Sequence, residues 1–166
     1  MGLVAIVLAA GRGNPDLYRL GLPPAWLLLA GPVAGVMVGL AVVGMTRFVT
    51  KRFEWAKDLH RSFHDLLGPL AVREIVILAL ASSIGEELFF RGALLPWIGV
   101  WWQALVFALL HVGPGKRFLP WTASAFVLGV GFGWLAIETG SIGGPIAAHF
   151  TINFLNLRRI VARERV

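Results

Sequence analysis

The sequence predicts an all-α fold, a polytopic bundle of transmembrane helices, and three observations support this prediction. Of the 166 residues, 57% are hydrophobic and only 14% are charged, whereas a soluble domain carries about a quarter charged residues. The mean hydropathy is +0.76. The apolar residues form long runs, and Lys and Arg stand near the ends of these runs, as they do in membrane proteins.

Net charge and cysteine content exclude several classes of function. The net charge is +6, but the basic residues form no stripe with interleaved aromatic residues, so we expect no nucleic-acid partner. The chain has no cysteine, which excludes disulfides, thiol catalysis and thiolate metal ligands. The partner that this composition requires is a lipid bilayer.

We divide the chain into a partial N-terminal span with a link, residues 1–25, and a single transmembrane domain, residues 26–166. The apolar stretch 3–10 is too short to cross a bilayer, because a transmembrane helix needs about 20 residues. The stretch 11–16 is rich in turn-forming residues and ends it. We expect the domain to contain five complete spans and one helix at the membrane surface.

The first complete span covers residues 26–48. Its glycines recur every four residues, at Gly31, Gly35 and Gly39. This spacing places them on one helix face, where a second backbone can approach closely.

Residues 51–67 predict an amphipathic helix. Apolar residues recur there at steps of three and four, with charged residues between them, a pattern typical of a helix that lies at the membrane surface. His60 and His64 are four residues apart on the polar side. A pair with this spacing can bind a metal, but without an acidic partner we expect solvated surface histidines.

Four more spans are expected at 73–95, 100–112, 119–137 and 146–157. A turn at 96–99 joins the first two as an antiparallel pair. Gly129 and Gly133 form a second face of small residues in the next span, and the Gly-rich loop 139–145 precedes the last one.

The basic residues predict the orientation. Most of the fifteen lie in three segments: 47–73, Lys116-Arg117, and the tail with Arg158, Arg159, Arg163 and Arg165. All three segments fall on one side of the predicted bundle, and the positive-inside rule makes that side cytoplasmic. We therefore expect a multi-pass protein of the plasma (inner) membrane with a cytoplasmic C-terminus.

Three ionisable residues interrupt the apolar run 75–95: Glu86, Glu87 and Arg91. A charge at the centre of a bilayer costs about 3 kcal/mol or more, so such residues are candidates for function. Adjacent helical residues point about 100° apart, so we expect only one of the two carboxylates to face a given cluster. Arg91 follows Glu87 by four residues, and the two can form an intrahelical pair.

Other polar residues are expected at the same depth. Glu86 and His111 lie at similar distances before and after the turn at 96–99, about 15–20 Å from it at the helical rise. His149 and Asn153 are four residues apart and share one helix face. These groups can satisfy one another in hydrocarbon, and their convergence predicts a functional site.

Three motifs stand on successive spans: Glu86-Glu87-x-x-x-Arg91, Phe107-x-x-x-His111 and His149-x-x-x-Asn153. Together they resemble the CAAX prenyl protease and bacteriocin-processing family, also called the type II CAAX endopeptidase or Abi family of intramembrane proteases. The resemblance covers roughly residues 73–157, and the flank 16–22 looks like the family's link between early spans. The chain departs from the family in its short N-terminal region and in the short turn at 96–99.

The resemblance implies hydrolysis of a peptide bond within the membrane, in a peptide or membrane-protein substrate. Glu86 and His111 would activate the attacking water. His149 and Asn153 would stabilise the oxyanion. Two further residues would support the site: Glu87 and Arg91.

Other chemistries could use the same residues. Glu86, His111 and His149 could bind zinc and leave a position open for water. Asn153, however, is a poor zinc ligand and a good oxyanion donor, so a metal-independent site is favoured and no cofactor is expected. The zinc signature His-Glu-x-x-His and intramembrane Asp residues are both absent. Ser141 in the Gly-rich loop, with His149 nearby, is a weaker alternative.

Two alternative functions are not enzymatic: transport and binding. Buried Glu and His could relay protons in a transporter, although no internal repeat is evident. A membrane protein that gives immunity to a peptide toxin by binding alone would also need a polar site. Loss of peptide cleavage on Glu86→Gln separates a protease from such a binder.

Overall fold

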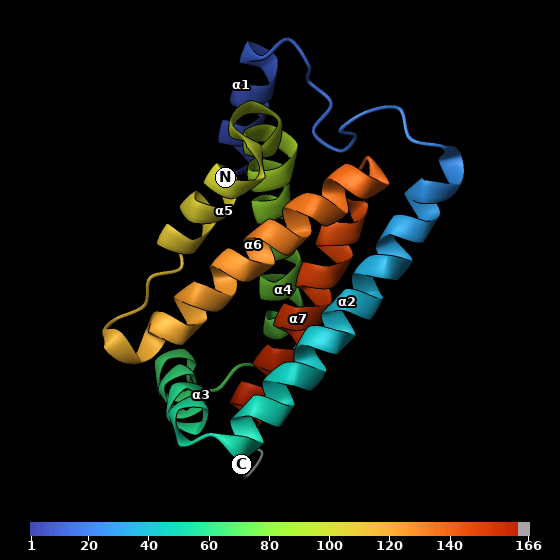
Figure 1. The fold of residues 1–166 in the computed structure, drawn as a ribbon. Coiled ribbons are helices and arrows are strands. Elements are labelled where there is room, and N and C mark those ends of the chain that lie inside the picture. The colour runs from blue at the N-terminus through green and yellow to red at the C-terminus, as the bar shows by residue number, and fades with distance from the viewer. Residues whose placement is uncertain (163–166) are drawn as a thin grey trace.

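A computed structural model describes residues 1–162 (Figure 1). The elements are α1 (Gly2–Gly11), α2 (Ala25–Arg52), α3 (Glu54–Leu67), α4 (Val72–Glu87), the π-helix η1 (Leu88–Leu94), α5 (Leu95–Leu109), the 3-10 helix η2 (Lys116–Phe118), α6 (Leu119–Thr139) and α7 (Gly143–Val161). Within residues 1–162 no strand forms, and Arg19 and Ser141 make an isolated antiparallel bridge. The predicted all-α class is confirmed.

Three helical segments of the described chain are long and apolar enough to cross a membrane: Ala25–Arg52, Val72–Leu109 and Lys116–Thr139. These three segments support the prediction that the chain is a membrane protein, but they do not confirm the expected number of five spans. The expected span 73–95 and most of the expected span 100–112 lie in the segment Val72–Leu109, which a non-helical residue, Gly99, divides into two arms. The expected last span lies in α7, whose apolar run is interrupted by polar side chains and which is not among the three.

The chain turns back at Gly99, near the start of α5. Gly99 has φ 77° and ψ 174°, a conformation that favours glycine. Figure 1 shows α5 leading from the upper end of α4 back toward α3. α5 packs mainly against α6 and η1, whereas α4 packs mainly against α7. The reversal predicted at 96–99 is present, but its two arms diverge and pack on different helices.

The predicted glycine face of α2 is confirmed at its interface with α7. Gly31, Gly35 and Gly39 are buried. A Cβ atom added at Gly35 would lie 2.0 Å from the carbonyl oxygen of Gly144, so the two backbones are in direct contact. This close approach brings α7 to the inside of the bundle.

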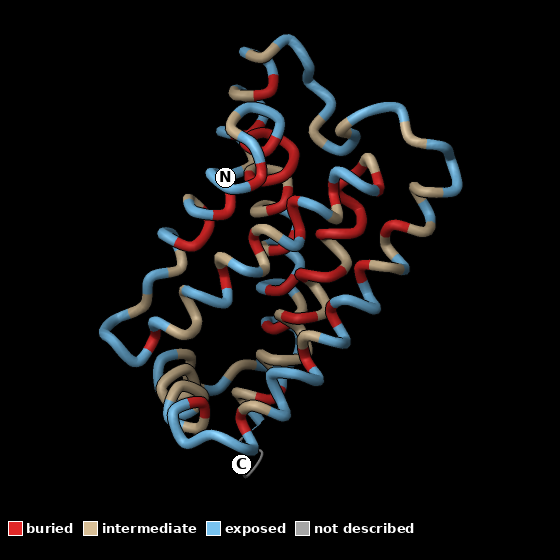
Figure 2. Tube along the Cα trace, in the orientation of Figure 1, coloured by how far each residue is buried: buried red, intermediate tan, exposed pale blue. Residues whose placement is uncertain are grey.

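The second predicted face of small residues packs α6 against α5. A Cβ atom at Gly129 would lie 2.9 Å from the Cβ of Ala104, and one at Gly133 would lie 3.0 Å from Nε2 of Gln103. Figure 2 shows that buried residues line the sides of helices that face one another, and that exposed residues cover the outer faces.

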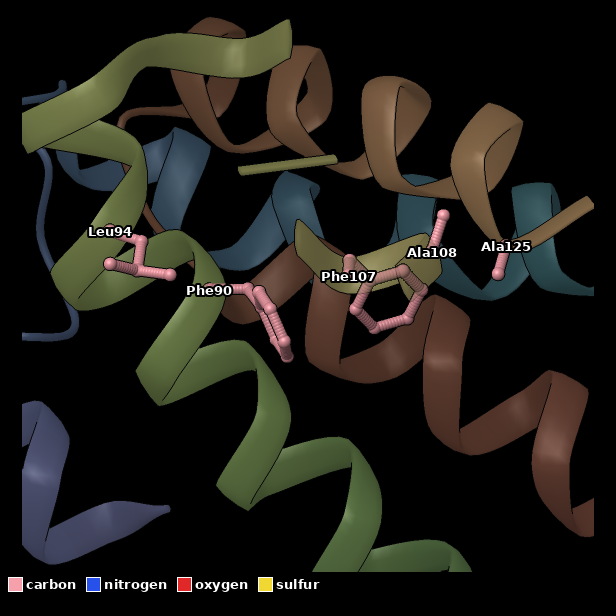
Figure 3. Close-up of a cluster of buried hydrophobic side chains, with 5 residues drawn as sticks. All are labelled: Phe90, Leu94, Phe107, Ala108 and Ala125. Atoms are coloured by element: carbon pink, nitrogen blue, oxygen red, sulfur yellow. The ribbon is translucent and has the colours of Figure 1, made fainter. Parts of the chain in front are cut away.

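One apolar cluster joins η1, α5 and α6. It contains Phe90, Leu94, Phe107, Ala108 and Ala125 (Figure 3). Leu8 of α1 packs against this cluster. Nη1 of Arg12 donates a hydrogen bond to the carbonyl of Ala93 at 2.8 Å. The N-terminal helix is therefore docked on η1, although its ten residues are too few to span a bilayer.

The amphipathic helix predicted at 51–67 is α3, which packs against α2, α7 and η2. The expectation that its histidines are solvated is wrong. His60 and His64 are half-buried, and Nδ1 of His64 lies 2.8 Å from the carbonyl oxygen of Ile160. The reason is that the last carbonyls of α7 lack helical partners and require a donor.

The three basic segments lie at one end of the molecule. Nη1 of Arg117 donates to Ser62 of α3 at 3.3 Å, and His64 contacts the end of α7. Figure 1 shows α3, the α5–α6 connection and the C-terminal end of α7 together at the lower end. Arg163 and Arg165 lie outside the described residues. The predicted clustering of positive charge on one side is thus present among the described residues.

The close contact at Gly35 generates a prediction about stability. In Gly35→Ala the new methyl group meets the Gly144 backbone, which cannot move aside as a flexible side chain can. Overpacking costs about 1–3 kcal/mol, and we expect thermal unfolding in detergent, followed by circular dichroism, to show at least this loss. Gly44→Ala is the control, because no atom lies within 4 Å of that position. Equal melting temperatures for the two variants would contradict the α2–α7 packing.

Candidate active site

The candidate site lies where α4 passes into η1. Glu86 and Glu87 end α4, and the π-helix begins at Leu88. Phe90, Arg91 and the next three residues are all buried. π-helical turns are rare and are frequent at functional sites. The sequence pattern did not predict this element, since periodicity alone does not distinguish a π turn inside an apolar helix.

Arg91 and Glu87 form a buried ion pair. Nη1 of Arg91 lies 2.9 Å from Oε1 of Glu87, and both side chains are fully buried. Nη2 of Arg91 donates to the carbonyl of Gly129 in α6 at 3.2 Å. The predicted intrahelical pair is confirmed, and it also ties η1 to α6.

Gln103 is a polar residue of the site that sequence reasoning missed. It is fully buried in α5, and its Nε2 donates to the same Gly129 carbonyl at 2.8 Å. A lone glutamine in the middle of an apolar span was the available signal, because hydrocarbon penalises an unsatisfied amide.

Aromatic rings surround the guanidinium of Arg91. Its Cζ atom lies 4.7 Å from the ring centroid of Phe107, 5.3 Å from that of Phe132 and 5.8 Å from that of Phe90. A cation over a ring face is attracted by the ring's quadrupole, most strongly where water is excluded. Phe107, the first residue of the second motif, therefore contacts the arginine of the first.

His149 of α7 lies between the two glutamates. Its Nδ1 is 2.7 Å from Oε1 of Glu87, and its Nε2 is 3.9 Å from Oε2 of Glu86. The expectation that only one carboxylate can face the cluster is wrong. The two side chains do leave the helix in different directions, but an imidazole has two nitrogens and meets one carboxylate with each.

His111 approaches Glu86 from the other side. Its Nε2 lies 3.7 Å from Oε2 of Glu86. Its Nδ1 lies 2.7 Å from the carbonyl oxygen of Phe107, and because a carbonyl only accepts, Nδ1 carries a proton. In neutral His111 the lone pair of Nε2 then points toward the glutamate.

Oε2 of Glu86 is buried and has no hydrogen-bond partner among the described residues. Its separations from the two imidazoles exceed a direct hydrogen bond and are of the size that a single bridging water can span. The predicted convergence of Glu86, His111 and His149 is thus present in the fold.

Asn153 stands beside this group. Its Nδ2 donates to Oγ of Ser82 at 2.9 Å. Ser82 lies one helical turn before Glu86, and Asn153 lies one turn after His149. Sequence reasoning missed Ser82, although a serine four residues before Glu86 lies on the same face of α4.

The weaker alternatives do not form the contacts they require. Ser141 is buried, but its Oγ has no partner among the described residues, and both nitrogens of His149 face carboxylates. Within residues 1–162, no group of three or more His, Asp or Glu side chains has the arrangement of a metal site. Glu86, His111 and His149 come nearest in chemistry, and their metal dependence is addressed by experiment below.

Comparisons with known proteins point to one family. The family model described as type II CAAX prenyl endopeptidase Rce1-like matches residues 68–155, which include every motif residue named above. An uncharacterised protein, YpbD, of Bacillus subtilis (strain 168) is 36% identical over 86 residues. That alignment spans 50% of this chain and 43% of the relative's length. No solved structure matches.

The buried ion pair generates a prediction about stability. Arg91→Met leaves the fully buried Glu87 charged and without its cation, which costs about 3–5 kcal/mol. We expect a correspondingly lower melting temperature in detergent. Replacing both charges, with Glu87→Gln and Arg91→Met together, should recover part of the loss.

Arg61→Met is the matched control for this experiment. Arg61 pairs with Asp58 on the surface of α3, and both side chains are more than half exposed. Exposed pairs contribute only about 0–1 kcal/mol. A loss for Arg91→Met no larger than that for Arg61→Met would contradict the buried pair.

Proposed function

Because this chain belongs to the type II CAAX prenyl endopeptidase Rce1-like family, a family of proteases, we propose that it is an intramembrane endopeptidase. In this proposal Glu86 and His111 activate a water molecule for attack on a peptide carbonyl. One observation carries the proposal: the buried, unpartnered Oε2 of Glu86 lies 3.7 Å from His111 and 3.9 Å from His149.

Glu86 acts as the general base. A carboxylate oxygen without a protein partner is free to accept a proton from water. His111, with Nδ1 bonded to the Phe107 carbonyl, offers the lone pair of Nε2 to the same water and orients it. The water then forms a bond to the carbonyl carbon, and its proton passes to Glu86.

His149 stabilises the oxyanion. In this role the imidazole carries a proton on each nitrogen: Nδ1–H is bonded to Glu87, and Nε2–H points into the site. The amide of Asn153 has two N–H groups; one is bonded to Ser82 and the other is free to bind the same oxygen. Fixed donors in a water-poor site stabilise developing negative charge effectively.

Hydrolysis is completed when Glu86 returns its proton. The protonated carboxyl donates to the leaving amine as the C–N bond breaks, which releases an amine and a carboxylic acid. Glu87 and Arg91 take no proton in this scheme. They hold His149 in position and keep its charge compensated.

The proposal extends to the substrate and the location. A peptide or membrane protein is the substrate, and the family's name makes a prenylated chain one candidate. The protein spans the plasma membrane several times with its basic end in the cytoplasm. Residues 26–166 act as one domain, to which residues 1–25 contribute a partial span and a link.

Substitutions in the site test the proposed roles. We expect Glu86→Gln, His111→Gln and His149→Gln each to lower cleavage of a fluorogenic peptide to a small residual rate, because each removes a proton acceptor or a charged donor. Asn153→Ala should lower the rate by about 10²–10³-fold, as loss of one oxyanion donor does. Glu138→Gln is the control, since Glu138 is an exposed carboxylate at the end of α6. Cleavage by well-expressed Glu86→Gln at the wild-type rate would rule out the mechanism and leave a binding protein.

Exposure to a chelator tests the metal-dependent alternative. The metal-independent mechanism predicts unchanged peptidase activity in detergent after exhaustive treatment with a zinc chelator. Loss of activity, restored by stoichiometric Zn²⁺ and accompanied by one zinc per chain, would instead make Glu86, His111 and His149 ligands. That donor set fits zinc, although Asn153 would then have no role in binding it.

Cysteine labelling tests the orientation. The chain contains no cysteine, so Lys116→Cys and Glu138→Cys each introduce a single thiol at an exposed position near opposite ends of α6. With an impermeant reagent added to intact cells, we expect labelling of the Glu138 variant and none of the Lys116 variant. The reverse pattern would overturn the assignment of the basic end to the cytoplasm.

A further inference from the structure

His111 lies just beyond the end of its own helix, which holds it by two contacts: its backbone N–H donates to the Ala108 carbonyl at 2.9 Å, and its Nδ1 lies 2.7 Å from the Phe107 carbonyl oxygen. α5 ends at Leu109, and His111 follows in a turn. Residues beyond a helix end lack the regular backbone bonds that fix direction. Contacts from outside α5 can therefore restrict the ring of His111 further.

Two neighbouring residues at the start of α6 supply such contacts. Oγ1 of Thr122 donates to the backbone carbonyl of His111 at 2.8 Å. The ring of Trp121 lies 5.2 Å from the imidazole, edge to face at 63°. The backbone and the ring of His111 are thus contacted from one turn of α6.

Trp121 in turn packs against α3. The Phe63 ring centroid is 5.2 Å from that of Trp121 at 81°, and it is also 5.1 Å from Phe118 at 84°. Edge-to-face geometry is the favoured arrangement for such rings. A continuous row of rings therefore runs from the surface helix through Trp121 to His111.

We propose that Trp121 is a positioning residue for His111 and that α3 supports it through Phe63. Trp121 touches no reacting atom. It limits the rotation of the imidazole, so that Nε2 stays directed at the water beside Glu86. This inference rests on the proposed peptidase mechanism and adds a role for the amphipathic helix that none of the three motifs contains.

The experiment uses the full chain in lipid nanodiscs. Trp121→Leu should lower kcat by about tenfold to a hundredfold, the cost of a misplacement near 1 Å, with KM within about twofold of wild type, because the substrate contacts are retained. Trp121→Phe keeps a ring and should recover most of the rate. Phe63→Leu should show a smaller loss of the same kind, and it serves in place of Trp121→Leu if that variant does not fold.

Two controls separate positioning from general damage. Trp134→Leu removes a tryptophan from the exposed face of the same helix and should leave kcat unchanged. In a His111→Gln background, Trp121→Leu should change the residual rate no further, because both substitutions act through one residue. A further loss in that background, or wild-type kcat in Trp121→Leu, would overturn the proposal.

A spectroscopic measurement keeps the inference independent of catalysis. The chain has four histidines, so NMR of histidine-labelled protein gives few ring signals, and His111→Gln identifies the one of interest. Trp121→Leu should shift and broaden the His111 signal and leave that of His149 unchanged. An unchanged His111 signal contradicts the positioning role. Absence of any peptidase activity in the wild type, with the expected shift present, instead contradicts the proposed function alone.

Discussion

Arg91 and Glu87 are fully buried and bonded to each other, and the remaining contacts of the site depend on this pair because each partner also reaches a second helix. Glu87 contacts His149 in α7, and Arg91 contacts the Gly129 carbonyl in α6. Neither charge is tolerable alone in hydrocarbon. Pairing compensates the charges, and the aromatic rings around Arg91 exclude water from them. The pair therefore links three helices at the point where the proposed chemistry takes place.

The pair also explains how two adjacent glutamates take different roles. Arg91 and Nδ1 of His149 both bond to Glu87 and compensate its charge. In the proposed mechanism Glu87 therefore holds these two side chains in position. Glu86 has no such partner for Oε2, which remains available toward His111 and His149. A buried ion pair adds little to stability compared with apolar packing. In the proposed mechanism the ion pair orients His149 through the hydrogen bond to Glu87, and an apolar pair could not form this bond.

Much of the site was predictable from spacing, because helical rise and helical periodicity are regular. The rise per residue predicted the common depth of Glu86 and His111, and four-residue spacing predicted the buried face at Gly31, Gly35 and Gly39. Features that depend on tertiary contacts were not predictable. The π-helix has no periodic signature, His64 is half-buried by the end of α7 rather than by its own helix, and His149 faces both glutamates only because α7 lies beside α4. Apolar runs predicted the reversal near 96–99 but not the divergence of its two arms, which depends on the packing of α4 on α7 and of α5 on α6.

The close approach of Gly35 to Gly144 has a consequence for how the protein is made. These two positions are far apart in the chain, yet their backbones touch and bring α7, with His149 and Asn153, to its place against α4. Translation produces α2 before α7. During synthesis Glu86 and His111 therefore enter the membrane well before the helix that carries the remaining site residues. The set of site residues is completed only when α7 docks against α2.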